Sequence, residues 1–267
     1  RKADVTAYDT NIQADSGLMS VTGTPEVSPL KVGAPVLDYA SGTMAAFAVA
    51  SALFQRQQTG QGQYIDFSML DATLVLMGST ATGYLYNGVM TAAPRGNAFS
   101  RAGGSAFKTK DGSLLMLGAL NSGQHERLWT ALDRPDLAAQ SSYDELDEIN
   151  GEAESELTRI LADRTAAEWE VFFHDHHVPA TRVNTLPEAL AQEQVGERKG
   201  LFHDLGRIPG CEDLTEVTVP VTGFTFAHGG PSVETAPPTM GAHTDEVLGE
   251  LGFSSDDIAA LRRQGVV

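Results

Sequence analysis

The chain of 267 residues is long enough for one large domain or two smaller ones, and its 42% hydrophobic and 20% charged residues are typical of a globular protein. Its 18 Lys and Arg residues against 35 Asp and Glu residues give a formal net charge of −17, which argues against nucleic acid and anionic membranes as partners. A single cysteine, Cys211, excludes an intramolecular disulfide and a cysteine-cluster metal site.

The first residues are unlike a natural chain start. The chain opens on Arg1 rather than Met, in a loop-like sequence without the apolar stretch of a signal peptide. We therefore expect a preceding segment to be absent. No apolar run reaches the length of a membrane span, and the single cysteine suits a reducing, cytoplasmic location.

Helical and extended patterns alternate in the first 90 residues. Tyr8 to Gly17 is typical of a short helix that ends at glycine, and residues 43–57 place apolar side chains mostly on one helical face. Residues 64–69 alternate with period two, as a strand does, and an apolar helix is predicted from Leu70 to Gly88. Helix, strand and helix in this order indicate a layered α/β domain.

A linker or mobile loop is predicted at residues 91–105, followed by a small α+β block. The block is expected to contain a hairpin around residues 106–117, helices at 123–132, 150–163 and 165–174, a strand at 178–183 and a helix from Leu186. Residues 206–241 are rich in Gly, Pro and Thr, with a short strand near 216–219. Two amphipathic helices are predicted at 245–251 and 254–264, the second capped by Ser254 or Ser255.

The stretch from Pro35 to Gly42 holds a lone carboxylate, Asp38, at or just before the start of the first long helix. Free N–H groups and the positive end of the helix dipole favour an ionised carboxylate there. Such a carboxylate, when it is not fully solvated, can attack an acyl group. The alternative is that Asp38 merely caps the helix, and the local pattern alone favours the cap.

Two further stretches contain candidate site residues. Gly103 and Gly104, together with Gly96, form either a loop that closes over a site or an ordinary flexible connection. The histidines between His174 and His177 have the wrong spacing for two ligands on one helical face, so we predict no metal site there.

Several motifs in the same order resemble the class III CoA-transferases, the CaiB/BaiF or formyl-CoA transferase family. The motifs lie at Ala7 to Gly17, Leu37 to Gly42, Thr59 to Ala72 and Met240 to Thr244, and the agreement includes Lys110 to Gly112 and Pro179 to Leu190. The resemblance implies an α/β fold with a Rossmann-like large domain, incomplete here, and a smaller α+β domain in an interlocked homodimer.

The resemblance also implies a domain division. Residues 1–90 are the remaining part of the large CoA-binding and catalytic domain, and residues 91–105 are a glycine-containing linker loop. Residues 106–205 form the small α+β domain, and residues 206–267 are a linker and a C-terminal segment that returns to the large domain.

Within this family, Asp38 corresponds to the residue that attacks the acyl-CoA thioester. A mixed aspartyl-acyl anhydride and then an aspartyl-CoA thioester follow, and the CoA passes to an acceptor carboxylate. The turn and helix N-terminus after Asp38 are expected to supply some N–H donors to the oxyanion. The implied substrates are acyl-CoA and a carboxylic acid, with coenzyme A as the transferred group and no metal.

The resemblance implies roles for six further residues. Ala7, Tyr8, Gln13 and Met69 are expected to contact CoA or substrate, and Gly103 and Gly104 correspond to the glycine loop that shields the intermediates from water.

Two alternatives stay open. In the sister α-methylacyl-CoA racemases, the matching aspartate is one of two proton-transfer groups, and a histidine stands at the position of Tyr8. A tyrosine is a poor proton acceptor near neutral pH, which favours the transferase. The second alternative is an inactive chain that binds CoA or a partner.

Overall fold

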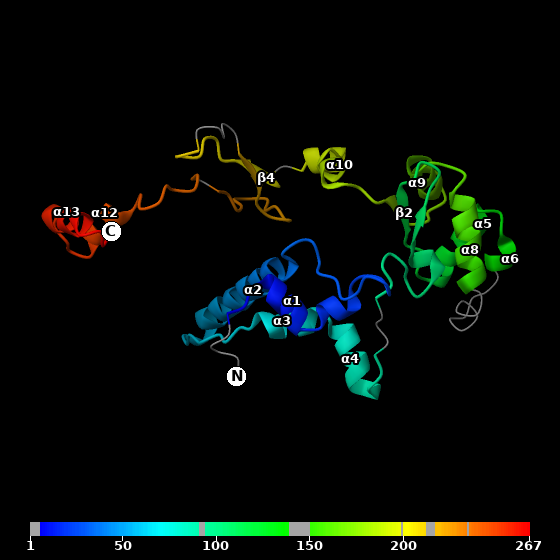
Figure 1. The fold of residues 1–267 in the computed structure, drawn as a ribbon, viewed down its shortest axis with the longest axis horizontal. Helices are drawn as coiled ribbons and strands as arrows, with labels where there is room; N and C mark the ends of the chain where they lie inside the picture. The colour runs from blue at the N-terminus through cyan, green and yellow to red at the C-terminus, as the bar shows by residue number, and fades with distance from the viewer. Residues whose placement is uncertain (1–5, 91–93, 139–149, 199, 212–216, 234) are drawn as a thin grey trace. The chain divides into compact units, whose positions relative to one another are not determined.

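The computed structural model describes residues 6–90, 94–138, 150–198, 200–211, 217–233 and 235–267 (Figure 1). The chain divides into two compact units, Arg1–Val183 and Asn184–Val267. The boundary between these units therefore lies within residues 106–205, the range expected for the small α+β domain. The described residues form helices and two small antiparallel sheets.

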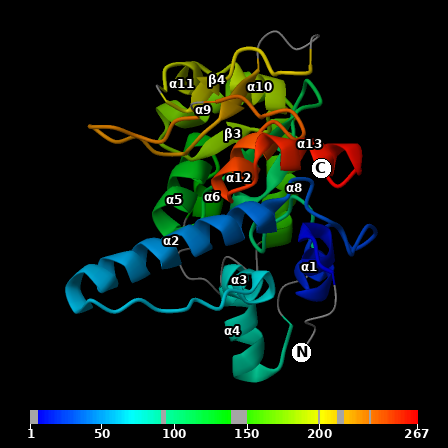
Figure 2. The same ribbon diagram turned by 90° about the vertical axis from the view of Figure 1, so that its left-hand side faces the viewer.

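The N-terminal region is helical. It contains α1 (Asp9–Asp15), the 3-10 helix η1 (Leu18–Val21), α2 (Val36–Thr59), α3 (Met69–Leu76) and α4 (Gly78–Asn87). Helices α1, α2 and α3 pack against one another, and α4 follows directly on α3 (Figure 2). Gly17 has a φ of 88° just after α1, a conformation that glycine adopts without strain, so the predicted glycine stop is confirmed.

Three predictions for this region need correction. Helix α2 begins at Val36, not at Thr43, so Asp38 lies inside its first turn. The strand predicted at residues 64–69 is absent, and residues 61–68 have no regular secondary structure. A strand needs a neighbouring strand for its backbone hydrogen bonds, and none of the described residues pairs with this segment. The single helix expected from Leu70 to Gly88 is two helices that meet at Met77.

Helix α2 exposes much of its apolar surface. Its 24 residues are long and apolar enough to cross a membrane by length and composition, with a mean hydropathy of 1.3 in the most apolar window. The prediction that no apolar stretch reaches the length of a membrane span is therefore wrong for α2, because alanines, rather than a run of large side chains, supply much of its apolarity. Core helices of soluble proteins can be equally long and apolar, but they are mostly buried, whereas only 11% of the most apolar stretch of α2 is buried. The large exposed side chains, Phe47 and Phe54 among them, form an apolar surface that this part of the chain does not cover.

A three-stranded antiparallel sheet forms the centre of the next block. Strand β2 (Leu114–Leu117) lies between β1 (Ala106–Lys108) and β3 (Ala180–Arg182). Phe107 pairs with Leu115, and Leu115 pairs on its other side with Arg182. The predicted hairpin and the predicted strand near residues 178–183 are therefore confirmed.

Helices build a core against this sheet. They are α5 (Ser122–Ala131), the short α6 (Pro135–Ala138), which the sequence analysis did not predict, α8 (Asn150–Leu161) and α9 (Ala166–Asp175). Buried positions on α8 recur every fourth residue, at Ala153, Leu157 and Leu161, as one helical face requires. The core also contains Phe107, Leu115, Leu117, Leu128, Trp129, Trp169 and Phe173.

Capping boxes begin several helices. At the start of α9, the Thr165 hydroxyl accepts a hydrogen bond from the Glu168 N–H, and the Glu168 carboxylate accepts one from the Thr165 N–H, as predicted. The Ser254 hydroxyl accepts a hydrogen bond from the Asp257 N–H at the start of α13, so the predicted serine cap is also confirmed.

The C-terminal unit has little sheet. Helices α10 (Leu186–Leu190) and α11 (Glu193–Gly196) precede β4 (Phe202–Asp204) and β5 (Thr218–Pro220), which pair with each other in antiparallel fashion. The strand predicted at 216–219 begins outside the described residues and is found at 218–220, and its partner β4 was not predicted.

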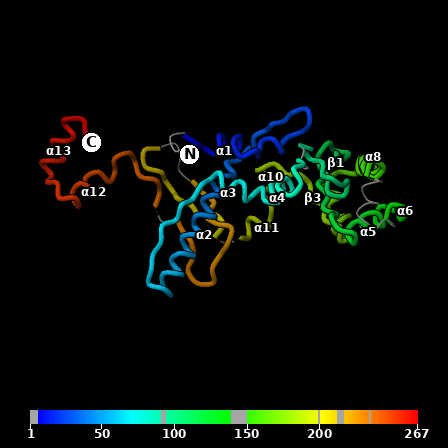
Figure 3. The backbone as a smooth tube through the Cα atoms, turned by 90° about the horizontal axis from the view of Figure 1, so that it is seen from below, coloured from blue at the N-terminus to red at the C-terminus, as the bar shows by residue number. Residues whose placement is uncertain are grey.

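Two adjacent helices, α12 (Thr244–Glu250) and α13 (Ser255–Arg263), follow near the C-terminus (Figure 3). They are joined by an ion pair of 2.6 Å between Arg262 and Asp245.

His125 is a titratable group within the core of the small block. It lies on α5 with its ring edge-on to Trp129, and its Nε2 is 3.3 Å from the carbonyl oxygen of Leu137 on α6. Burial lowers the pKa of His125 from its usual value of 6.5, and the charge of Arg101 adds to that effect.

We expect His125 to make the stability of this block depend on pH. The unfolded chain takes up a proton near pH 6.5, whereas the folded chain does so only at lower pH, so stability falls as the pH drops below about 6.5. Melting temperatures at pH 7.5 and 5.5 measure this loss, which we expect to be smaller in His125→Gln. Equal losses in the two proteins would contradict the assignment to His125.

Candidate active site around Asp38

Asp38 lies in the first turn of α2, where its side chain is exposed to solvent. The preceding residue, Leu37, is 1% exposed and anchors this turn in the packed interior. None of the described residues forms a hydrogen bond with the Asp38 carboxylate, and the residue at the N-cap position is Pro35. The reading of Asp38 as a helix cap is therefore wrong, and its carboxylate is available to a ligand.

The carboxylate that caps α2 comes from Asp9, on α1. Its Oδ2 accepts hydrogen bonds from the backbone N–H of Leu37 at 2.7 Å and of Asp38 at 3.2 Å. The N–H of Val36 donates to the carbonyl of Ala34 at 2.8 Å. All three N–H groups at the start of α2 are thus engaged, so they cannot serve as free oxyanion donors, contrary to our expectation.

Gln13 braces the Asp9 carboxylate from the next turn of α1. Its Nε2 donates to Asp9 Oδ1 at 2.5 Å, and its Oε1 accepts from the backbone N–H of Val32 at 2.9 Å. The Gln13 side chain is fully buried and both ends of its amide are engaged. In this conformation Gln13 cannot touch CoA, and it supports the turn that carries Asp38 instead.

Three expected CoA-contacting residues lie at or near helix starts. Ala7 and Tyr8 are exposed beside the first residue of α1, and Met69 is half-buried as the first residue of α3. The hydrogen bond from the Leu37 N–H to Asp9 brings the start of α1, next to Tyr8, against the start of α2. Ala7, Tyr8 and Asp38 therefore share one region of the surface.

Gly103 and Gly104 are buried rather than part of an open loop. They form the 3-10 turn η2 (Ala102–Gly104), which is held by the Ala119 N–H donating to the Gly103 carbonyl at 2.8 Å. A Cβ on Gly103 would lie 2.8 Å from the Ala119 carbonyl oxygen, and one on Gly104 would lie 2.6 Å from the Leu120 side chain. Close packing explains both glycines, and neither is free to close over a site in this conformation.

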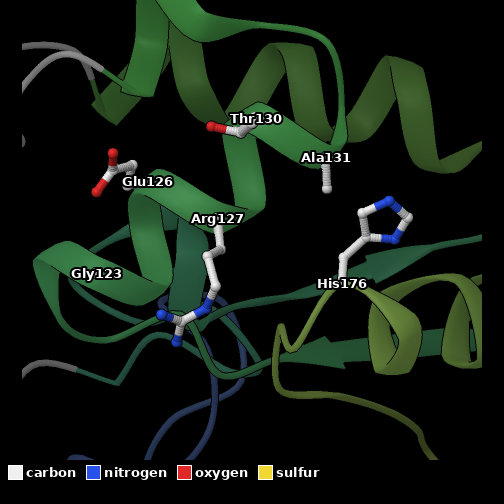
Figure 4. Close-up of a pocket in the computed structure, with 6 residues that line it drawn as sticks. All are labelled: Gly123, Glu126, Arg127, Thr130, Ala131 and His176. Atoms are coloured by element: carbon white, nitrogen blue, oxygen red, sulfur yellow. The ribbon is translucent and has the colours of Figure 1, made fainter.

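Among the described residues, cavities also occur away from the predicted site residues. One of about 580 Å³ is lined by Glu126, Arg127 and Thr130 on α5 and by His176 beyond α9 (Figure 4). There the Arg127 Nε donates to the His177 carbonyl at 3.1 Å. No group of three or more possible metal ligands occurs among the described residues.

Another cavity, of about 690 Å³, is mostly apolar. It lies between the segment after α1 and helices α3 and α4, with Gly17, Leu74, Met77 and Leu85 among its lining residues. Its residues come from segments far apart in the sequence, so no local motif could have identified it.

The comparisons with known proteins agree on one family. The model of CoA-transferase family III matches residues 1–244. The chain is 31% identical over 268 residues to human succinyl-CoA:glutarate CoA-transferase, covering 97% of this chain and 59% of that protein. It is 29% identical over 264 residues to succinyl-CoA--D-citramalate CoA-transferase of Chloroflexus aurantiacus, covering 96% and 63% respectively.

A racemase and a solved structure are also similar. The α-methylacyl-CoA racemase of Mus musculus is 28% identical over 274 residues, covering 98% of this chain and 67% of that protein. The crystal structure of a CaiB/BaiF family protein from Brucella suis has a TM-score of 0.72 at 25% identity, covering 94% of this chain and 64% of that one. The chain thus spans about three fifths of the length of the two transferases.

Proposed function

Because the chain belongs to CoA-transferase family III, we propose that the protein moves coenzyme A from an acyl-CoA thioester to a carboxylic acid, with Asp38 as the nucleophile. The observation that carries this proposal is the exposed Asp38 carboxylate, which has no hydrogen-bond partner among the described residues. We take Asp38 to be the counterpart of the family's nucleophilic aspartate, as the resemblance of the motif from Leu37 to Gly42 implies. A carboxylate fixed in a helical turn yet open to solvent can reach a bound thioester.

The proposed reaction proceeds through four nucleophilic attacks. An Asp38 oxygen attacks the acyl carbon, the carbon–sulfur bond breaks, and an aspartyl-acyl anhydride and CoA thiolate form. The thiolate attacks the Asp38 carbonyl carbon, which releases the donor acid as carboxylate and leaves an aspartyl-CoA thioester. The acceptor carboxylate then attacks this thioester and expels the thiolate. Thiolate attack on the acceptor carbonyl gives the new acyl-CoA and restores Asp38.

Each attack places negative charge on a carbonyl oxygen, which needs hydrogen-bond donors. The first N–H groups of α2 are engaged by Asp9 and Ala34. We therefore propose that other groups donate these hydrogen bonds. They include groups in the part of the protein that corresponds to the segment of the relatives that this chain does not span. With a net charge of −17, the chain must also meet the anionic substrates through local cations or N–H groups.

The remaining expectations are part of the same proposal. Ala7, Tyr8 and Met69 contact the pantetheine and thiol end of CoA, in a Rossmann-like large domain of an interlocked, cytoplasmic homodimer. Tyr8 and Ala7 are exposed and Met69 is half-buried, which leaves all three accessible to a ligand. The absence of a histidine at Tyr8 supports transfer over racemisation.

Dicarboxylates are the first substrates to test. Both similar transferases are named for succinyl-CoA as donor, with glutarate or D-citramalate as acceptor. We propose a short dicarboxylic acid as acceptor and succinyl-CoA as donor.

A panel of acids tests the proposal. The full-length protein is incubated with succinyl-CoA and glutarate, D-citramalate or a monocarboxylic acid, and new CoA thioesters are measured by mass spectrometry. Hydroxylamine added during turnover should convert the Asp38 intermediate to a hydroxamate, detectable in its peptide. Absence of exchange and of the hydroxamate would refute the proposal. Deuterium uptake at the α-carbon of a 2-methylacyl-CoA without CoA exchange would instead identify a racemase.

A further inference from the structure

We infer that Asp9 is a positioning residue for Asp38: its buried carboxylate holds the first turn of α2 and keeps the Asp38 carboxylate free to react. This inference rests on the proposed function, because it assigns the role of a second aspartate in the same site. It concerns how the chain orients the nucleophile, and it requires no contact between Asp9 and substrate.

The contacts of Asp9 cross three segments of the chain. Asp9 is 5% exposed, and its Oδ2 receives the N–H groups of Leu37 and Asp38 at 2.7 and 3.2 Å. Its Oδ1 receives the amide of Gln13 at 2.5 Å, and Gln13 in turn accepts from the Val32 N–H at 2.9 Å. Because both oxygens are bonded, the carboxylate cannot rotate away from the start of α2.

An aspartate suits this position for a physical reason. The N-cap residue of α2 is Pro35, whose side chain has no acceptor, so the first turn lacks a local cap. A carboxylate is the strongest available acceptor for these N–H groups, and its charge is favourable at a helix N-terminus. Asp9 supplies this cap from 28 residues earlier in the chain.

The cap has a consequence for Asp38 itself. An aspartate in the first turn of a helix is attracted to the free N–H groups at the helix start. Here the Leu37 and Asp38 N–H groups already bond to Asp9. The Asp38 carboxylate therefore has no free donor in its own turn to fold back on, and it stays exposed to an incoming thioester.

A purely structural role for Asp9 predicts something different. If Asp9 and Gln13 only join α1 to α2, their loss lowers the melting temperature but not the turnover of molecules that remain folded. A positioning role instead predicts a lower kcat with little change in KM, because the bound thioester meets a misplaced nucleophile.

The test uses a compensating pair. In Asp9→Asn, the amide oxygen can still accept from the N–H groups of Leu37 and Asp38. The new amide nitrogen then faces the Gln13 amide nitrogen, and because both are donors, the hydrogen bond between residues 9 and 13 is lost. Adding Gln13→Glu restores it, since a carboxylate accepts from the new amide and from the Val32 N–H. The double variant keeps the net charge of the original pair. Glu168→Gln, which weakens the capping box of α9, serves as the matched control.

In the full-length protein we expect Asp9→Asn to lower kcat for CoA transfer about 10-fold to 100-fold at similar KM. The rate of hydroxylamine trapping at Asp38 should fall in parallel. The double variant should recover most of both rates, and Glu168→Gln should leave both unchanged. An unchanged kcat in Asp9→Asn would overturn the inference, and so would a double variant whose kcat is no higher than that of Asp9→Asn. In either case, CoA transfer by the wild type would leave the proposed function intact.

Two further outcomes are decisive. If the wild type forms neither exchanged thioester nor Asp38 hydroxamate, the proposed function fails and the inference fails with it. If Asp9→Asn does not fold, Gln13→Met replaces it, since it removes the brace but leaves the two N–H bonds. We expect kcat to fall in Gln13→Met as well, and an unchanged kcat in this folded variant would overturn the inference.

Discussion

Replacing Asp38 with asparagine is expected to lower the rate of CoA transfer by about 10³-fold or more, because removal of a covalent nucleophile abolishes the step on which all later ones depend. The asparagine amide has nearly the same size as the carboxylate, but it is a poor nucleophile toward a thioester. Because the Asp38 side chain is exposed and lacks a hydrogen-bond partner among the described residues, its loss should cost little stability. Initial rates with succinyl-CoA and the best acceptor acid measure the effect.

The chain offers a matched control for this substitution. Asp71 is also exposed in the first turn of a helix, α3, where its N–H donates to the Ser68 hydroxyl. Asp71→Asn therefore makes the same chemical change in the same kind of position without touching the proposed nucleophile. We expect its transfer rate to stay within about twofold of wild type. A transfer rate in Asp38→Asn within tenfold of wild type, without a trapped adduct, would contradict the assignment.

Sequence patterns predicted the elements that are determined locally. The hairpin around Lys110 to Gly112 and the capping box from Thr165 to Glu168 each depend on residues close together in the chain. The strand expected at residues 64–69 failed for the opposite reason, because pairing needs a partner from elsewhere in the chain. Period-two alternation alone cannot supply that partner.

The candidate site shows the same limit. Asp38 lies in the first turn of α2, at the helix start as predicted, but it is exposed to solvent rather than partly shielded, and its role as the nucleophile stays a prediction. The cap on that turn could not be found, because Asp9 lies 28 residues before Leu37 and no local pattern links them. Gly103 was expected to be mobile, yet its contact with Ala119 shows that a glycine can be required by packing alone.

The core of the small block should be the part of the chain most sensitive to truncation. Phe173 is fully buried on α9, where its ring stacks on Trp169 at 5.3 Å between centroids and meets Phe172 edge-on at 5.4 Å. Phe173→Ala removes these contacts and leaves a cavity, because a packed core relaxes only in part. We expect a loss of about 3–5 kcal/mol in the free energy of unfolding.

Val171 on the same helix provides the control for this truncation. Its side chain is 64% exposed, so Val171→Ala makes a similar change in helix propensity without opening a cavity. We expect Val171→Ala to remain within about 0.5 kcal/mol of wild type, whereas Phe173→Ala should lower the melting temperature by roughly 6–20 °C. Thermal and urea unfolding followed by circular dichroism measure both. Similar losses in the two variants would mean that α9 does not pack on this core through Phe173.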